Sequence, residues 1–280
     1  MTIDFHTHIY PEWLRDQREK YIARDATFGE LFAGPKAKMA TAEELVKAMD
    51  EDGVATSVVM GVGWTDQGLA RDVNDYIIDS ARKYPGRIIG FGGVNPAWGD
   101  AAVKEADRCA RAGLRGIGEL HPDTQGFAIQ DRLAMEPLVE VLLEHKLILT
   151  THSSEPVGHL YQGKGHTTPD KLWAFIENFP DVKVVCAHWG GGLPFYALMP
   201  EVAAALANVY FDTAASPFLY SAGIFPQAVT LIGAERILMA SDFPLLRAKR
   251  LLKQINDSPL SAGDKLKITS SNAAQLLGLA

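Results

Sequence analysis

The sequence predicts an α/β protein folded as a (β/α)8 TIM barrel. Short β-branched or apolar runs alternate with amphipathic helical stretches along the whole chain, which is typical of a parallel sheet covered by helices. Turn signals such as Asp52-Gly53, Pro85-Gly86 and Ala112-Gly113 end helices and admit the next strand. The third observation is the number of these units, because eight of them in one chain indicate a closed barrel.

The strands are predicted where apolar and β-branched residues run together over four to six positions. In chain order they cover residues 2–6, 56–60, 88–93, 114–119, 147–151, 183–187, 209–212 and 237–240. Helices are predicted where apolar residues recur every three or four positions. They cover residues 42–52, 67–83, 100–112, 131–145, 169–178, 194–206 and 224–233, and the segment after Pro244 supplies the last helices.

Two connections are unusually long and follow the first and fifth strands, at residues 9–41 and 153–168. In such a barrel the loops after the strands lie at the C-terminal face, where active sites are built. No linker, repeat or low-complexity tract divides the chain. We therefore expect one domain over residues 1–280.

Composition excludes several classes of partner. The formal net charge of −7 and the absence of a Lys/Arg block argue against nucleic acid and anionic membranes. No apolar run approaches the length of a membrane span, and the N-terminus lacks the pattern of a signal peptide. We expect a cytoplasmic enzyme with a small-molecule substrate, and homo-oligomerisation stays open. Cys109 and Cys186 are expected to be free thiols.

A candidate metal site begins in the first strand, with His6 and His8. Side chains two positions apart on a strand point to the same face, so the two imidazoles could share one ion. Two histidines on a strand can also be ordinary core or surface residues. What decides between these interpretations is the set of polar residues at the other strand ends.

Further metal-binding residue types end four other predicted strands, and strand ends of a barrel converge around its axis. They are Glu119, His152, His188 and Asp242. Imidazoles with carboxylates and no thiolate favour a catalytic divalent ion, for which we expect zinc, with manganese or iron as alternatives. Asp242 could instead cap the next helix.

Other residues are weaker candidates. His121 shares a face with Glu119 if the fourth strand continues, but one of the two could face water in the loop. Trp64 follows a strand end, where it could contact substrate or simply pack beneath the loops. His145 ends a helix at the opposite face and is expected to be structural.

Several motifs resemble the amidohydrolase superfamily, and more narrowly the amidohydrolase 2 branch that contains aminocarboxymuconate-semialdehyde decarboxylase and related enzymes. These motifs are Asp4-x-His6-x-His8, Ala187-His188-Trp189-Gly190-Gly191, Ser241-Asp242-Phe243-Pro244 and the stretch from Ser271 to Leu277. The resemblance implies that His6, His8, His152 and Asp242 bind one metal ion, with His188 beside it as a proton-transfer or polarising residue.

One motif resembles a different branch. Gly116-Ile117-Gly118-Glu119 is similar to the fourth-strand motif of two-metal members, in which the glutamate bridges the ions and His152 and His188 would bind the second. We expect one ion, with two as the alternative.

The expected activity is metal-dependent hydrolysis of a small amide, ester or lactone. A bound ion would activate water, Asp242 would act as general base and His188 would polarise the carbonyl. The alternative is a metal-dependent, non-oxidative decarboxylase of an aromatic or unsaturated acid. That enzyme needs a cation for the substrate carboxylate, and Arg247 is the nearest candidate, although it could equally be a solvated helix residue. Hydrolysis is preferred because the predicted loops contain no evident arginine clamp.

Overall fold

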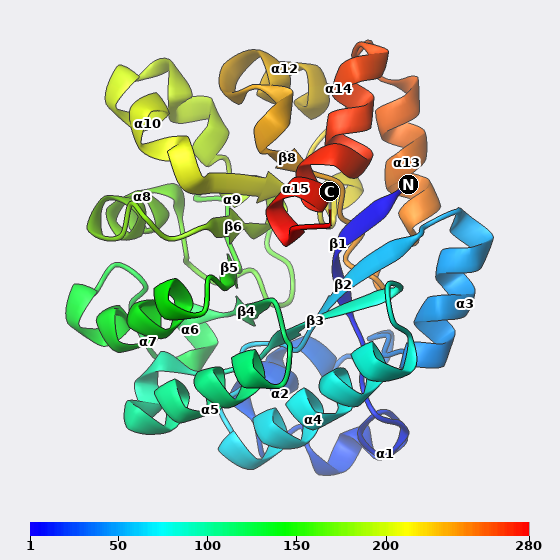
Figure 1. Ribbon diagram of the computed structural model, residues 1–280, viewed down its shortest axis with the longest axis vertical. Helices are drawn as coiled ribbons and strands as arrows, with labels where there is room; N and C mark the ends of the chain where they lie inside the picture. Colours follow the sequence, from blue (N-terminus) through cyan, green and yellow to red (C-terminus); the bar gives the residue numbers. More distant parts are fainter. Residues whose placement is uncertain (280) are drawn as a thin grey trace.

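The computed structural model describes residues 1–279 as eight parallel strands in the order β1 to β8, surrounded by helices (Figure 1). The predicted (β/α)8 barrel is confirmed. The strands are β1 (Ile3–His8), β2 (Thr56–Met60), β3 (Ile88–Gly92), β4 (Gly116–Leu120), β5 (Ile148–Thr151), β6 (Val184–Cys186), β7 (Val209–Asp212) and β8 (Ile237–Leu238).

Strand β1 meets the residues that follow β8 through the backbone, which brings the two ends of the sheet together. Phe5 N–H donates to Met239 O (2.9 Å), and His8 N–H donates to Phe243 O (2.7 Å). Between them, Asp242 N–H donates to His6 O at 2.9 Å. The closing seam therefore runs directly through three of the predicted site residues.

Helical segments follow the strands, and most of these segments form the outer layer. They are α1 (Glu12–Asp16), α2 (Ala26–Phe32), α3 (Ala42–Asp52), α4 (Gln67–Lys83), α5 (Asp100–Arg111), α6 (Pro122–Gln125), α7 (Arg132–Glu144), α8 (Pro169–Asn178), α9 (Ala187–Gly190), α10 (Pro200–Ala205), α11 (Ser216–Leu219), α12 (Ile224–Ile232), α13 (Ala248–Asp257), α14 (Ala262–Leu266) and α15 (Asn272–Leu277). Their termini follow the sequence signals. Thr41 and Glu44 form a capping box at the start of α3, and Gly53 ends it with φ 71°.

One predicted helix, over residues 194–206, is interrupted. A 3-10 turn covers Leu193–Leu198, and α10 begins only at Pro200. Proline at the first helical position is favourable, but in a helix interior it would remove a hydrogen bond and clash with the preceding turn. None of the helices formed by residues 1–279 has the length and apolar character that crossing a membrane requires.

The core has two layers. One apolar cluster lies between the strands and the helices, and a smaller one fills the barrel, where Phe5 and Phe91 meet edge to face at 5.9 Å. Helix α15 contributes Ala273 and Leu277 to the inner cluster, beside β1. Helix α15 accordingly lies beside β1 in Figure 1. Because apolar side chains pack the barrel interior, a polar site is left to the C-terminal ends of the strands.

Candidate active site

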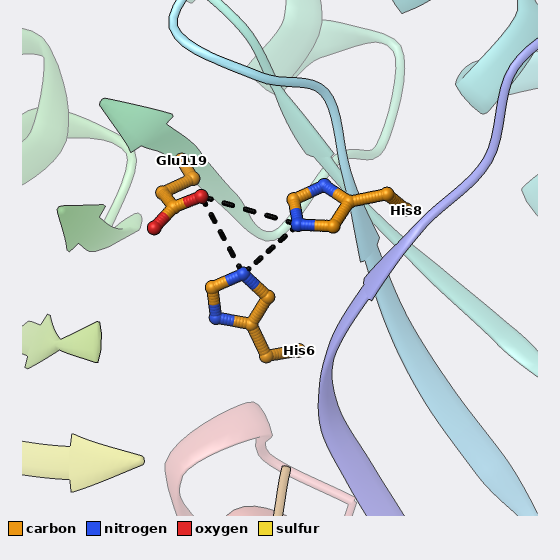
Figure 2. A group of neighbouring side chains, drawn as sticks. All are labelled: His6, His8 and Glu119. Carbon is orange, nitrogen blue, oxygen red and sulfur yellow. Dashed lines mark hydrogen bonds and ion pairs between the residues drawn. The ribbon is translucent and has the colours of Figure 1, made fainter. Parts of the chain in front are cut away.

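Backbone irregularities turn two strands toward the barrel mouth. The register of β1 against β2 shifts between Asp4 and Thr7, and that of β4 against β5 shifts between Ile117 and Leu120. Such shifts re-aim side chains and are frequent beside active sites. The first carries His6 and His8 toward the centre, and the second does the same for Glu119, so these three side chains meet in space (Figure 2).

The first group of candidate ligands consists of His6, His8 and Glu119, with Asp242 next to it. The Nε2 atoms of His6 and His8 lie 3.1 Å apart, and they lie 3.5 and 3.9 Å from Glu119 Oε2. Asp242 Oδ1 is 3.3 Å from His8 Nε2. Two ring nitrogens this close repel unless a proton or a cation lies between them. The buried donor set therefore fits a divalent ion.

The second group shares Glu119. Its other oxygen, Oε1, lies 3.2 Å from His152 Nδ1 and 3.5 Å from His188 Nε2. Both imidazoles are buried. Glu119 thus stands between the His6–His8 pair and the His152–His188 pair.

Hydrogen bonds fix which nitrogen of each imidazole faces the centre. A ring N–H held by an acceptor leaves the opposite nitrogen with a free lone pair, as metal-ligating histidines require. The acceptors are Asp212 Oδ2 for His6 Nδ1 (2.8 Å), Met60 O for His8 Nδ1 (3.2 Å), Ala214 O for His188 Nδ1 (3.1 Å) and Lys164 O for His152 Nε2 (3.1 Å). In the neutral imidazoles all four lone pairs therefore point toward the group around Glu119, and protonation of His188 places an N–H there instead.

Asp212 is a site residue that our sequence reasoning missed. It is fully buried at the end of β7, and besides His6 it accepts from the backbone N–H groups of His188 (2.9 Å) and Ala214 (3.0 Å). The signal was available, because a carboxylate at a strand end is the pattern that identified Asp242.

The pKa shifts in the cluster show that its carboxyl groups favour the ionised form and that His188 favours the protonated form. Burial opposes ionisation of Glu119, but its imidazole neighbours lower the pKa of that carboxyl well below its usual range. Burial likewise disfavours charged His188, yet Glu119 raises its pKa to about 9. The pKa of Asp242 is lowered by His8 and its neighbours, against the effect of burial.

The backbone at two site residues is strained. His188 has φ 55° and Asp242 has φ 65°, in the left-handed region that non-glycine residues rarely adopt. Each such residue costs on the order of 1–3 kcal/mol and persists where its surroundings enforce it. Here the hydrogen bonds from His188 N–H to Asp212 and from Asp242 N–H to His6 hold the two residues in place.

A cavity of about 690 Å³ opens above this cluster. Its floor includes His8, Glu119, His152, His188 and Asp242. Its walls are largely apolar and come from the loops after β1, β2, β7 and β8, with Leu31, Phe32, Val62, Phe218, Leu219 and Pro244 among them. The cavity therefore offers an apolar surface to a ring or chain and polar groups to a head group.

The two predicted substrate contacts have different outcomes. His121 lines the cavity, stacks on His152 at 4.3 Å and is held by Gly163 O (2.9 Å), and burial together with His152 lowers its pKa to about 4. Trp64 is fully buried and is not among the described residues lining the cavity. Its indole fits between Gly61 and Gly93, where a Cβ would come within 2.6 and 2.7 Å of it. This position is consistent with packing, the other interpretation we considered.

The profile of the family described as "Amidohydrolase" matches residues 3–279. The chain belongs to the amidohydrolase family. Among its curated relatives within the family are a gamma-resorcylate decarboxylase of a Polaromonas species (24% identity over 84% of this chain and 86% of the relative) and a 2-amino-3-carboxymuconate-6-semialdehyde decarboxylase of Dictyostelium discoideum (22% identity over 100% and 92%).

Solved structures of the same shape include two with bound manganese. One is a 5-carboxyvanillate decarboxylase from Novosphingobium aromaticivorans with 3-methoxy-4-hydroxy-5-nitrobenzoic acid (TM-score 0.82, 19% identity, covering 99% of this chain and 97% of that one). The other is a dihydroxybenzoic acid decarboxylase from a Polaromonas species with 2-nitroresorcinol (TM-score 0.76, 19% identity, covering 99% and 97%).

These comparisons correct the predicted activity. The curated relatives are decarboxylases, so hydrolysis, which we preferred from the sequence, is wrong as the main expectation. The prediction failed because we looked only for arginine as the cation that a carboxylate requires. Arg247 is indeed occupied elsewhere, by Asp52 (2.8 Å) and Glu51 (2.8 Å), but Lys36 and Lys38 of the loop after β1 line the cavity.

Proposed function

We propose that the protein is a metal-dependent, non-oxidative decarboxylase of an aromatic or unsaturated carboxylic acid. The observation that carries this proposal is the cavity, in which apolar walls stand over a floor of imidazoles and carboxylates. A flat ring fits between the walls while its carboxylate reaches the floor. The decarboxylase names of the relatives support the same reaction class.

His6, His8, Glu119 and Asp242 would hold one divalent ion in this proposal. Four distances between facing atoms of these residues lie between 3.1 and 3.9 Å. Neighbouring ligands that each lie about 2.1 Å from one ion are separated by about this much. His152, predicted as a ligand of the same ion, lies in the other group and would complete a second site if two ions bind. Zinc remains our sequence-based expectation, while manganese suits the carboxylates equally well.

The bound ion supplies positive charge that holds substrate oxygens and offsets their charge. The protein's own contribution is the proton. His188 Nε2 faces the centre with its ring fixed by Ala214 O, so it can donate a proton to the carbon that carries the carboxylate. The electrons of the breaking C–CO2 bond then return to the substrate, CO2 leaves, and solvent reprotonates His188. Asp242, the other donor considered from the sequence, would have to carry a proton against the direction in which its neighbours shift its pKa.

Two positively charged side chains lie at the mouth of the cavity, where an acid would enter. Lys36 and Lys38 are exposed lining residues, and Lys38 Nζ lies 3.3 Å from Leu245 O of the neighbouring loop after β8. Two cations at an entrance attract an anionic substrate to an otherwise acidic protein.

The test is incubation of the metal-loaded enzyme with a panel of hydroxybenzoic, vanillic and unsaturated acids, with CO2 release and product followed together. Formation of equal amounts of CO2 and the decarboxylated ring is expected for at least one acid. Absence of CO2 release across the panel, in enzyme shown to contain metal, would contradict the proposal.

A further inference from the structure

Tyr10 is a site residue that the reaction above does not use. It follows β1 two positions after His8 and is 0% exposed. Its ring packs edge-on against Phe32 at 5.3 Å and Phe28 at 6.5 Å, and its backbone N–H donates to Ala40 O at 2.8 Å. The side chain is therefore held rigidly by the first long loop.

The hydroxyl of Tyr10 has no hydrogen-bond partner among residues 1–279. Leaving a buried hydroxyl unpaired costs on the order of 1–3 kcal/mol, and buried polar groups in folded proteins are rarely left so. Phenylalanine would fill the same space among Phe28 and Phe32 without this cost. An unpaired phenol in this position therefore indicates a partner that is not part of the protein.

The position of Tyr10 shows where that partner lies. Tyr10 lines the cavity together with His8, Glu119 and Asp242. A second tyrosine of the cavity, Tyr161, offers a contrast, because its hydroxyl donates to Glu155 Oε2 at 3.1 Å. Of these two cavity phenols, only that of Tyr10 is left for a ligand.

We propose that Tyr10 Oη donates a hydrogen bond to the carboxylate of the substrate and so positions it on the cavity floor. This inference rests on the proposed function and adds a specificity residue to it. A neutral phenol has one proton to donate, and its strongest acceptors are anionic oxygens. With the carboxylate fixed between Tyr10 and the floor, the ring of the substrate extends toward the apolar walls.

The contact has a distinct kinetic consequence. The carboxylate loses its negative charge as CO2 forms, so a hydrogen bond to it is no stronger in the transition state than in the bound substrate. Such an interaction lowers KM without raising kcat. Tyr10→Phe should therefore raise KM about 10- to 100-fold and change kcat little, which a proton donor such as His188 would not do.

The first test needs no ligand. Tyr10→Phe removes an unpaired hydroxyl, so the Tm of the metal-loaded enzyme should stay the same or rise. Tyr161→Phe, the matched control, removes a hydroxyl paired with Glu155 and should lower it. A clear loss of Tm in Tyr10→Phe would show that the phenol has an internal partner, which would overturn the inference.

The second test compares ligands with and without a carboxyl group, measured by calorimetry on metal-loaded protein. The pairs are 2,6-dihydroxybenzoate with resorcinol and 4-hydroxybenzoate with phenol. Tyr10→Phe should weaken binding of the acids about 10- to 100-fold and binding of the parent rings less than about twofold. Tyr161→Phe should leave the ratio of the affinity for each acid to the affinity for its parent ring unchanged.

The outcomes separate the two proposals. If wild type binds the acids and Tyr10→Phe binds them equally well, or weakens acid and ring alike, the role of Tyr10 is wrong and the decarboxylase proposal stands. If wild type binds none of these acids and decarboxylates none of the larger panel, the decarboxylase proposal fails and the inference fails with it.

Discussion

Asp212 gives the sharpest prediction about the metal centre, through the substitution Asp212→Asn. In the structure Asp212 Oδ2 holds the Nδ1 hydrogen of His6 at 2.8 Å, which leaves His6 Nε2 free to bind an ion. An asparagine can keep Oδ1 as the acceptor for His188 and Ala214, but it then turns an NH2 group toward His6. The NH2 group of the asparagine and the Nδ1–H of His6 would then be two donors that face each other. We expect His6 to adopt the other tautomer, with its proton on Nε2, so that Nδ1 can accept a hydrogen bond from the asparagine.

The magnitude follows from that change of tautomer. A histidine with its proton on Nε2 has no lone pair for the ion, and loss of such outer partners typically weakens metal binding 10- to 100-fold, or about 1.4–2.7 kcal/mol. The free energy of unfolding should fall by only about 1–3 kcal/mol, because two hydrogen bonds to a charged oxygen become bonds to a neutral one. The barrel should therefore remain folded.

The assay is competition for zinc or manganese with a fluorescent chelator, alongside thermal unfolding. Asp107→Asn is the matched control, since Asp107 Oδ1 holds His145 Nε2 at the same 2.8 Å, in a pair that is not part of the site cluster. The control should bind metal like wild type. Wild-type metal affinity in folded Asp212→Asn would refute the claim that Asp212 sets the tautomer of His6.

Three further predictions concern the same site. Glu119→Gln should leave about one ion per chain, bound more weakly than in wild type, and elemental analysis showing a fall from two ions to one would contradict the single-ion proposal. His188→Gln should lower kcat about 10²- to 10⁴-fold with KM little changed, and steady-state kinetics with near-normal kcat would rule out His188 as the donor. The double substitution Lys36→Ala with Lys38→Ala should lower kcat/KM and flatten its dependence on salt, and an unchanged salt dependence would exclude steering by these lysines.

Periodicity and turn signals were sufficient to predict the barrel from the sequence. The predicted strand over residues 56–60 and the predicted helices over 42–52, 67–83 and 169–178 coincide with the structure, because each lies between clear capping or turn signals. The first strand reaches His8 rather than residue 6. A run such as His6-Thr7-His8 is polar, so propensity alone does not extend a strand through it.

The strand-end rule also placed His6, His8, Glu119, His188 and Asp242 at one mouth, but it could not show how they are divided. The shifts in β1 and β4 that aim these side chains depend on pairing with neighbouring strands, which no local pattern encodes. Tyr10 was missed for a related reason. An isolated tyrosine after a strand is an ordinary core residue until its hydroxyl is known to lack a partner.

The seam between β1 and the residues after β8 makes the site a product of the whole chain. His6 and His8 precede Asp242 by more than 200 positions in the sequence, yet Asp242 hydrogen-bonds to the backbone of His6, and Phe243 to that of His8, directly across the seam. A nascent or truncated chain therefore has no complete ion site until its last strand docks. The proposed ion would bind the closed barrel more tightly than any partly folded form, and so it would stabilise the last step of folding. Removal of the metal should therefore destabilise the contact between β1 and the residues after β8 before it destabilises the rest of the barrel.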